Sequence, residues 1–129
     1  MATIIDVFKS KNNFLAGEGV SESLITNAEE ALNLSFSKEY KDYLKTYGIA
    51  AYDGHEITGI TKSPRVNVVD VTNAERKRKP DIPSDLYVIE ETDVEEIVIW
   101  QSGDGKIFYS GPNQDLTHLC NSLTEYVSK

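Results

Sequence analysis

Cysteine and histidine are scarce in this chain of 129 residues, which has one cysteine, Cys120, and two histidines, His55 and His118. A single cysteine cannot form an intramolecular disulfide, and these three side chains cannot complete a four-ligand zinc site. The sequence therefore excludes a disulfide scaffold and a structural zinc site, and it predicts no cofactor. We expect the whole chain, residues 1–129, to fold as one domain around its own hydrophobic core.

Long apolar runs and positive charge are also lacking. No stretch approaches the roughly 20 apolar residues of a membrane-spanning helix, and the first six residues carry no basic side chain, so we expect a cytoplasmic protein without a membrane partner. The 13 Lys and Arg stand against 21 Asp and Glu, which gives a net charge of −8. This charge repels phosphate backbones and therefore argues against nucleic acid and favours a basic partner.

Catalytic motifs are missing as well. The sequence contains no nucleotide-binding loop, nucleophile elbow or metal motif. On the helix expected there, His118 and Cys120 would point to different sides, so they do not form a nucleophile–base pair. The glycines of residues 102–105 indicate a hairpin loop rather than a phosphate loop, because no helix follows them. The sequence therefore predicts a protein that is not an enzyme.

Apolar residues at helical spacing are present in the first half of the chain and near its end. They predict a short helix after Thr3, helices over 22–33, 38–47 and 115–127, and one that is capped near Asn67 or Asp70 and ends before Pro80. The helix over 38–47 carries Tyr40, Tyr43 and Tyr47 on one face. Their rings could stack on a ligand, but the helical spacing favours packing in the core.

Short β-branched and aromatic runs follow Pro83. They predict an antiparallel sheet of four or more strands, built from residues 57–60, 86–90, 96–101 and 106–110, with Gly111–Asn113 ending the sheet. Helices that flank such a sheet define an α+β fold. The side chains predicted to be in the core are Leu32, Tyr40, Leu44, Ile89, Ile99 and Leu123.

Two charged runs stand out against this pattern. Residues 76–79 are all basic, but consecutive helical positions point in four directions, so we interpret them as a solvated helix end. Residues 85–104 contain seven acidic side chains and no Lys or Arg. Such a concentration of one sign suits an interface with a basic protein, although each acid alone could equally serve solubility.

The order of these segments resembles the SUKH superfamily over about residues 22–127. Phe36-Ser37 stands where that family usually has leucine-proline, and residues 48–54 carry one glycine fewer than its pattern. The segments that carry the resemblance are Glu29–Leu34, Ser37–Leu44 with Gly48, Val69 with Thr72 and Arg76, Ile82–Ile89, Asp104–Phe108 and Leu116–Val127.

The resemblance implies binding rather than catalysis. Bacterial members of the superfamily are immunity proteins encoded beside polymorphic toxins, and others, including a fungal cell-wall regulator, are interaction proteins. It therefore implies an immunity protein that blocks a cognate toxin domain, expected to be basic and nuclease-like. The alternative is a general interaction scaffold or regulator of the same fold.

The acidic run and nearby aromatic residues supply the candidate interface. We expect the acids at its rim, where charge steers association, and Tyr52 and Trp100 as apolar anchors, although Trp100 fits the core equally well. The predicted partner-binding residues are Tyr52, Asp53, Glu56, Glu90, Glu91, Asp93, Glu95, Glu96 and Trp100.

Overall fold

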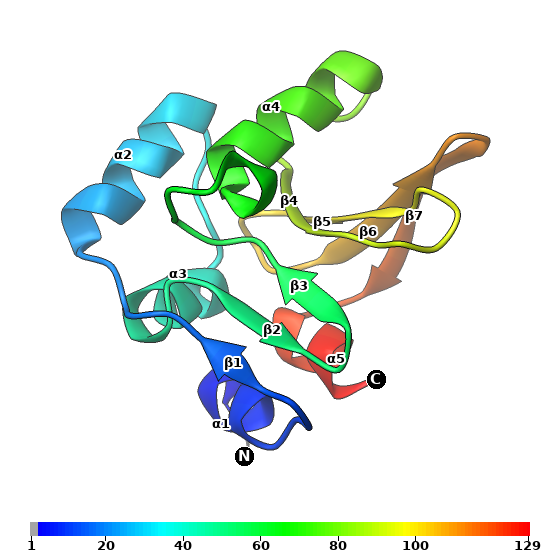
Figure 1. Ribbon diagram of the computed structural model, residues 1–129. Helices are drawn as coiled ribbons and strands as arrows, with labels where there is room; N and C mark the ends of the chain where they lie inside the picture. Colours follow the sequence, from blue (N-terminus) through cyan, green and yellow to red (C-terminus); the bar gives the residue numbers. More distant parts are fainter. Residues whose placement is uncertain (1–2) are drawn as a thin grey trace.

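The computed structural model describes residues 3–129 and confirms the α+β class (Figure 1). Its helices and strands follow one another as α1 (Ile4–Lys9), β1 (Leu15–Ala16), α2 (Glu22–Leu32), α3 (Lys38–Thr46), β2 (Ala50–Tyr52), β3 (His55–Ile57), the 3-10 helix η1 (Pro64–Val66), α4 (Val68–Arg78), β4 (Tyr87–Glu91), β5 (Val98–Gln101), β6 (Ile107–Gly111), β7 (Gln114–Cys120) and α5 (Leu123–Ser128).

Local capping explains why the predicted helices begin where they do. The side chains of Thr3, Ser21, Ser37 and Asn67 each accept a hydrogen bond from a backbone N–H in the first turn of the helix that follows. Past the end of α3, Gly48 has a φ of +71°, a left-handed conformation that suits glycine. These starts and stops confirm the prediction.

The strands form two antiparallel sheets rather than one. β4, β5, β6 and β7 pair in that order, and the first three of them are the strands predicted after residue 85, whereas β1, β2 and β3 form a smaller sheet. The prediction that residues 57–60 join the larger sheet was wrong. A two-residue turn with positive φ at Asp53 and Gly54 folds β3 back onto β2, as a type I′ hairpin does. One backbone hydrogen bond of 2.8 Å, from Thr58 N to Ile89 O, then links the two sheets.

The prediction of a helix over 115–127 was also wrong. Residues Gln114–Cys120 form strand β7, and α5 begins only after Ser122, whose side chain caps it. The apolar spacing of this segment fits a helix, but β6 needs a partner for its backbone hydrogen bonds, and pairing with β7 supplies it. Pro112 and Asn113 therefore form a turn inside the sheet instead of ending it.

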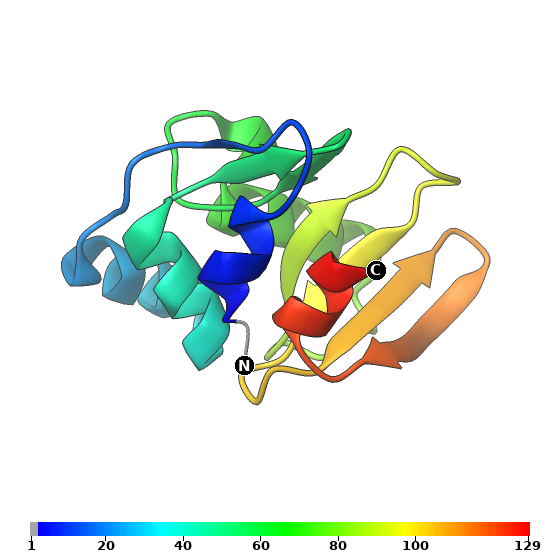
Figure 2. The same ribbon diagram turned by 90° about the horizontal axis from the view of Figure 1, so that it is seen from below.

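The core lies mainly on one face of the larger sheet. α1, α3 and α5 pack against one another (Figure 2). All six residues predicted to be in the core are at most 4 % exposed. On the opposite face, α4 covers a second, smaller apolar cluster formed by Val71, Leu86, Val88, Val98 and Trp100. Successive strand residues point to opposite faces, which is why β4 and β5 contribute to both clusters.

The tyrosines of α3 are packing residues, as their spacing predicts. Tyr40 and Tyr43 are fully buried, and their hydroxyls both meet Thr58, at 2.9 Å from its Oγ1 and from its carbonyl oxygen respectively. Thr58 Oγ1 in turn donates to Val88 O at 2.7 Å. Burial raises the pKa of Tyr43, in keeping with a neutral hydrogen-bonding role.

The basic run at the end of α4 is only partly solvated, which corrects the prediction. The guanidinium of Arg76 donates to the carbonyls of Leu32 and Ser84, and Lys79 Nζ donates to those of Gly111 and Gln114. Lys77 and Arg78 are exposed. The run therefore ties the end of α4 to neighbouring segments and does not form one basic face.

Candidate functional site

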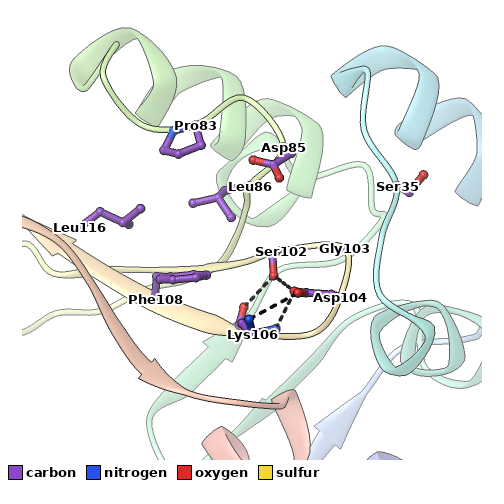
Figure 3. A pocket seen from close by; sticks show the side chains of 10 residues that line it. All are labelled: Ser35, Pro83, Asp85, Leu86, Ser102, Gly103, Asp104, Lys106, Phe108 and Leu116. Carbon is purple, nitrogen blue, oxygen red and sulfur yellow. Dashed lines mark hydrogen bonds and ion pairs between the residues drawn. The ribbon is translucent and has the colours of Figure 1, made fainter.

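A cleft of about 170 Å³ between β3, η1 and the end of β4 brings together four of the nine predicted partner-binding residues. We call it the acidic cleft, and it is lined by Gly54, Glu56, Thr58, Arg65, Val66, Glu90, Glu91, Thr92 and Asp93. A larger hollow of about 670 Å³ at the other end of β4 contains none of the nine (Figure 3).

Glu56 forms one wall of the acidic cleft together with Arg65. The two guanidinium nitrogens of Arg65 donate to the two carboxylate oxygens of Glu56 at 2.8 and 2.6 Å, a bidentate pair. These hydrogen bonds hold the pKa of Glu56 below its ordinary value. Because both side chains are about half exposed or more, this pair is open to exchange with a partner's charges.

Glu90 lies at the bottom of the cleft and is only 3 % exposed, so its predicted place at an interface rim was wrong. Its carboxylate accepts a hydrogen bond of 2.6 Å from the Tyr126 hydroxyl and lies 2.9 Å from His55 Nδ1. Burial raises the pKa of Tyr126, with the Glu90 charge adding to the shift, which keeps this phenol a hydrogen-bond donor. Glu90 therefore ties α5 and β3 to β4 and has a structural role.

Glu91, the next residue, projects from the other face of β4 toward α4. Partial burial raises the pKa of Glu91 to about 7, and the neighbouring carboxylate of Glu75 adds to the rise. Glu75 is itself only 5 % exposed and has Arg78 Nη1 at 3.7 Å from its carboxylate. Glu91, which lines the cleft, thus lies beside the carboxylate of Glu75, which does not line it, and a partner's cation placed next to Glu91 would relieve the repulsion between the two.

We expect Glu91→Gln to stabilise the protein increasingly as pH rises. A carboxyl whose pKa is higher in the folded state favours folding below the unfolded pKa of about 4.5, and this contribution is lost as pH rises through about 7. Melting temperatures at pH 4 and pH 8 check this: the variant should match the natural protein at pH 4 and melt higher at pH 8. Glu95→Gln, which removes the same charge from an exposed position, is the matched control. Equal pH dependence of the two variants would contradict the expectation.

The connection from β4 to β5 carries the remaining predicted acids. Asp93, Glu95 and Glu96 are exposed, and Val94 between them is 64 % exposed. Glu95 and Glu96 have φ values of +52° and +57°, a left-handed conformation that is costly for residues other than glycine. Hydrogen bonds from Thr92 N to Ile97 O and from Ile97 N to Val94 O, both 3.0 Å, close this loop and hold its shape. The loop therefore exposes one apolar side chain, Val94, with acidic residues on both sides of it in the sequence.

Neither predicted aromatic anchor is available at the surface. Trp100 is 1 % exposed and donates from Nε1 to Ser110 Oγ at 2.9 Å beneath α4, so it belongs to the core. Tyr52 is 6 % exposed and stacks on His55 with ring centroids 5.0 Å apart. Asp53 is exposed and has a positive φ in the turn between β2 and β3, beside the cleft. The prediction of Tyr52 as an exposed anchor was wrong, and of the two alternatives for Trp100 the structure confirms the core.

Three residues of this region, Arg65, Glu75 and Val94, were not predicted from the sequence. Arg65 comes from a segment far from the acidic run, and nothing in the sequence pairs it with Glu56. Glu75 sits in a helix whose pattern gives no sign that one acid is buried. The exposure of Val94 could have been predicted, because a single apolar residue between acidic residues of a loop is not part of an apolar pattern that would bury it.

Comparisons with known proteins agree with this fold. The family model SUKH_5, described as SMI1-KNR4 cell-wall, matches residues 1–129. A crystal structure of a protein from Pseudomonas syringae pv. tomato is similar with a TM-score of 0.75 and 17 % sequence identity, covering 95 % of this chain and 92 % of that one. A search of curated proteins found no match. Within residues 3–129, no helix has both the length and the apolar character to cross a bilayer.

Proposed function

The chain belongs to the SUKH_5 family (SMI1-KNR4 cell-wall), and from that premise we propose that it is a non-enzymatic immunity protein. It binds a cognate bacterial toxin domain in the cytoplasm and blocks it by occupying its surface. The toxin domain is basic. We infer that it is nuclease-like, because enzymes that act on nucleic acid bind the phosphate backbone through basic surfaces. The acidic cleft and the loop that follows β4 provide the contact.

One observation carries this proposal. Glu56, Glu91 and Asp93, which come from two separate segments of the chain, line a single cleft in which Arg65 is the one basic side chain. The exposed acids Glu95 and Glu96 extend the same negative surface, and Val94 adds an exposed apolar contact. Complementary charge of this kind raises the rate of encounter with a basic protein and disfavours wrong partners.

The size of the molecule is compatible with blocking by one face. A nanomolar complex corresponds to about −12 kcal/mol and typically buries roughly 800 Å² on each partner. The folded chain has 7147 Å² of accessible surface, so such an interface would occupy about one ninth of it. An interface of this size therefore fits on one face of the molecule.

Titration of toxin activity against this protein tests the proposal. We expect a sharp loss of activity that ends near one equivalent, using the toxin domain encoded beside this gene. The double variant His55→Asn and Cys120→Ser should protect equally well after correction for stability, because neither side chain performs chemistry in an occlusion mechanism. Continued inactivation of toxin at a tenth of an equivalent would reveal an enzyme, and no protection at several equivalents would exclude this partner.

A further inference from the structure

A hollow larger than the acidic cleft lies on the outer face of the larger sheet, away from that cleft. Figure 3 shows the apolar side chains of Pro83, Leu86, Phe108 and Leu116 around one side of it, and Asp85 with the 102–106 loop around the other. We call it the Phe108 groove. It has a volume of about 670 Å³ and is lined by Ser35, Pro83, Asp85, Leu86, Ser102, Gly103, Asp104, Lys106, Phe108 and Leu116.

The groove exists because α4 covers only part of this sheet face. Val88, Trp100, Phe108 and His118 form one row of directly paired residues across β4, β5, β6 and β7. Val88 and Trp100 are buried beneath α4, Phe108 is half-buried, and His118 is exposed. Apolar surface therefore continues past the edge of the helix, where Phe108 and Leu116 remain partly open to solvent.

Negative charge borders the same groove. The carboxylate of Asp85 is exposed and forms no hydrogen bond or ion pair with any other residue in the range 3–129. Asp104 faces it from the 102–106 loop and has Lys106 Nζ at 3.8 Å, a distance at which the two charges offset each other. One net negative charge thus remains beside the apolar floor.

The loop that carries Asp104 is held in place before any ligand arrives. Ser102 N donates to Lys106 O at 3.0 Å, and Gly105 N donates to Ser102 O at 2.9 Å. The loop also packs closely on the segment between α2 and α3, since a Cβ at Gly103 would lie 2.9 Å from Ser35 O. A preformed wall reduces the ordering cost of binding.

We propose that the Phe108 groove binds a peptide segment of a partner protein in which an apolar side chain neighbours a lysine or arginine. The apolar side chain covers Phe108 and Leu116, and the cation pairs with Asp85. Charge complementarity selects this occupant, because an acidic or uncharged polar segment would leave Asp85 without a counter-charge beside apolar surface. The groove shares no residue with the acidic cleft, so this site stands whether or not the immunity function is correct.

Titration of the isotope-labelled protein with an octapeptide of alternating lysine and leucine, followed by NMR, tests the groove. We expect saturable shifts of the backbone amides around Asp85, Gly103, Phe108 and Leu116. Leu116→Ser and Asp85→Asn should each weaken binding several-fold, whereas Glu30→Gln, which removes an exposed acid on α2, should not. Circular dichroism and melting temperature confirm that each variant is folded.

Two further peptides separate the contributions. Alternating lysine and serine lacks the apolar side chain, and alternating glutamate and leucine lacks the cation, so both should bind at least several-fold more weakly. Equal binding of the glutamate peptide, shifts that map to the acidic cleft instead of the groove, or no saturable shift at all would each overturn the proposal.

Discussion

Leu44→Ala is expected to cost about 2–5 kcal/mol of unfolding free energy, because it removes three heavy atoms from a fully buried position. Leu44 is 0 % exposed on α3, in the cluster that also contains Tyr40 and Tyr43. Both tyrosines hydrogen-bond to Thr58, whose backbone N–H links the two sheets, so this cluster includes residues that join the sheets. Chemical denaturation measures the loss, and a melting temperature lower by roughly 10 °C should accompany it.

Leu24→Ala provides the matched control for this change. The same atoms are removed from a leucine on α2 that is 47 % exposed, and surface changes usually stay within about 0.5 kcal/mol. A loss below about 1 kcal/mol for Leu44→Ala would contradict the placement of α3 in the core.

Reversal of Glu91, Asp93 and Glu95 to lysine is expected to slow association with the toxin domain by about tenfold or more at low salt. At pH 8, where Glu91 is ionised, three negative charges become three positive ones at the acidic cleft and its loop, so a basic partner is repelled where it was attracted. The salt dependence of the association rate should flatten or reverse. Stopped-flow or surface-based kinetics at several ionic strengths measures both effects.

A second triple reversal distinguishes the local surface from the total charge. Glu18, Glu30 and Asp81 are exposed, lie outside the acidic cleft and form no ion pair with other residues in the range 3–129. Their reversal changes the net charge equally and should slow association much less. Equal effects of the two triple variants would mean that the partner responds to net charge alone and that the cleft is not the interface.

Local chemistry explains which parts of the fold could be predicted. Ser21, Ser37 and Asn67 mark helix starts because each side chain satisfies N–H groups only two or three residues away. The 102–105 loop likewise joins neighbouring strands in the sequence, so β5 and β6 could be placed. The SUKH resemblance rests on the order of such local signals, and the family model confirms it over the whole chain.

The candidate site was only partly predictable for the same reason. A run of acids between residues 90 and 96 indicates a negative surface, and Glu91, Asp93, Glu95 and Glu96 are indeed exposed. Whether one acid within such a run points outward depends on the pleat of the strand and on what packs above it. Glu90 occupies the alternate position and lies under His55 and Tyr126, which come from distant segments.

By itself, the sequence determined the α+β class, the starts of α1 to α4, the meander from β4 to β6, and the excess of negative charge around residues 85–104. Only the tertiary structure decided that 114–120 is a strand, that Tyr52 and Trp100 are buried, and that Glu56, Arg65 and Glu91 share one cleft. The physical reason is the sequence distance over which each interaction acts. Caps and turns are settled between residues a few positions apart, whereas strand pairing and burial depend on which distant segments meet.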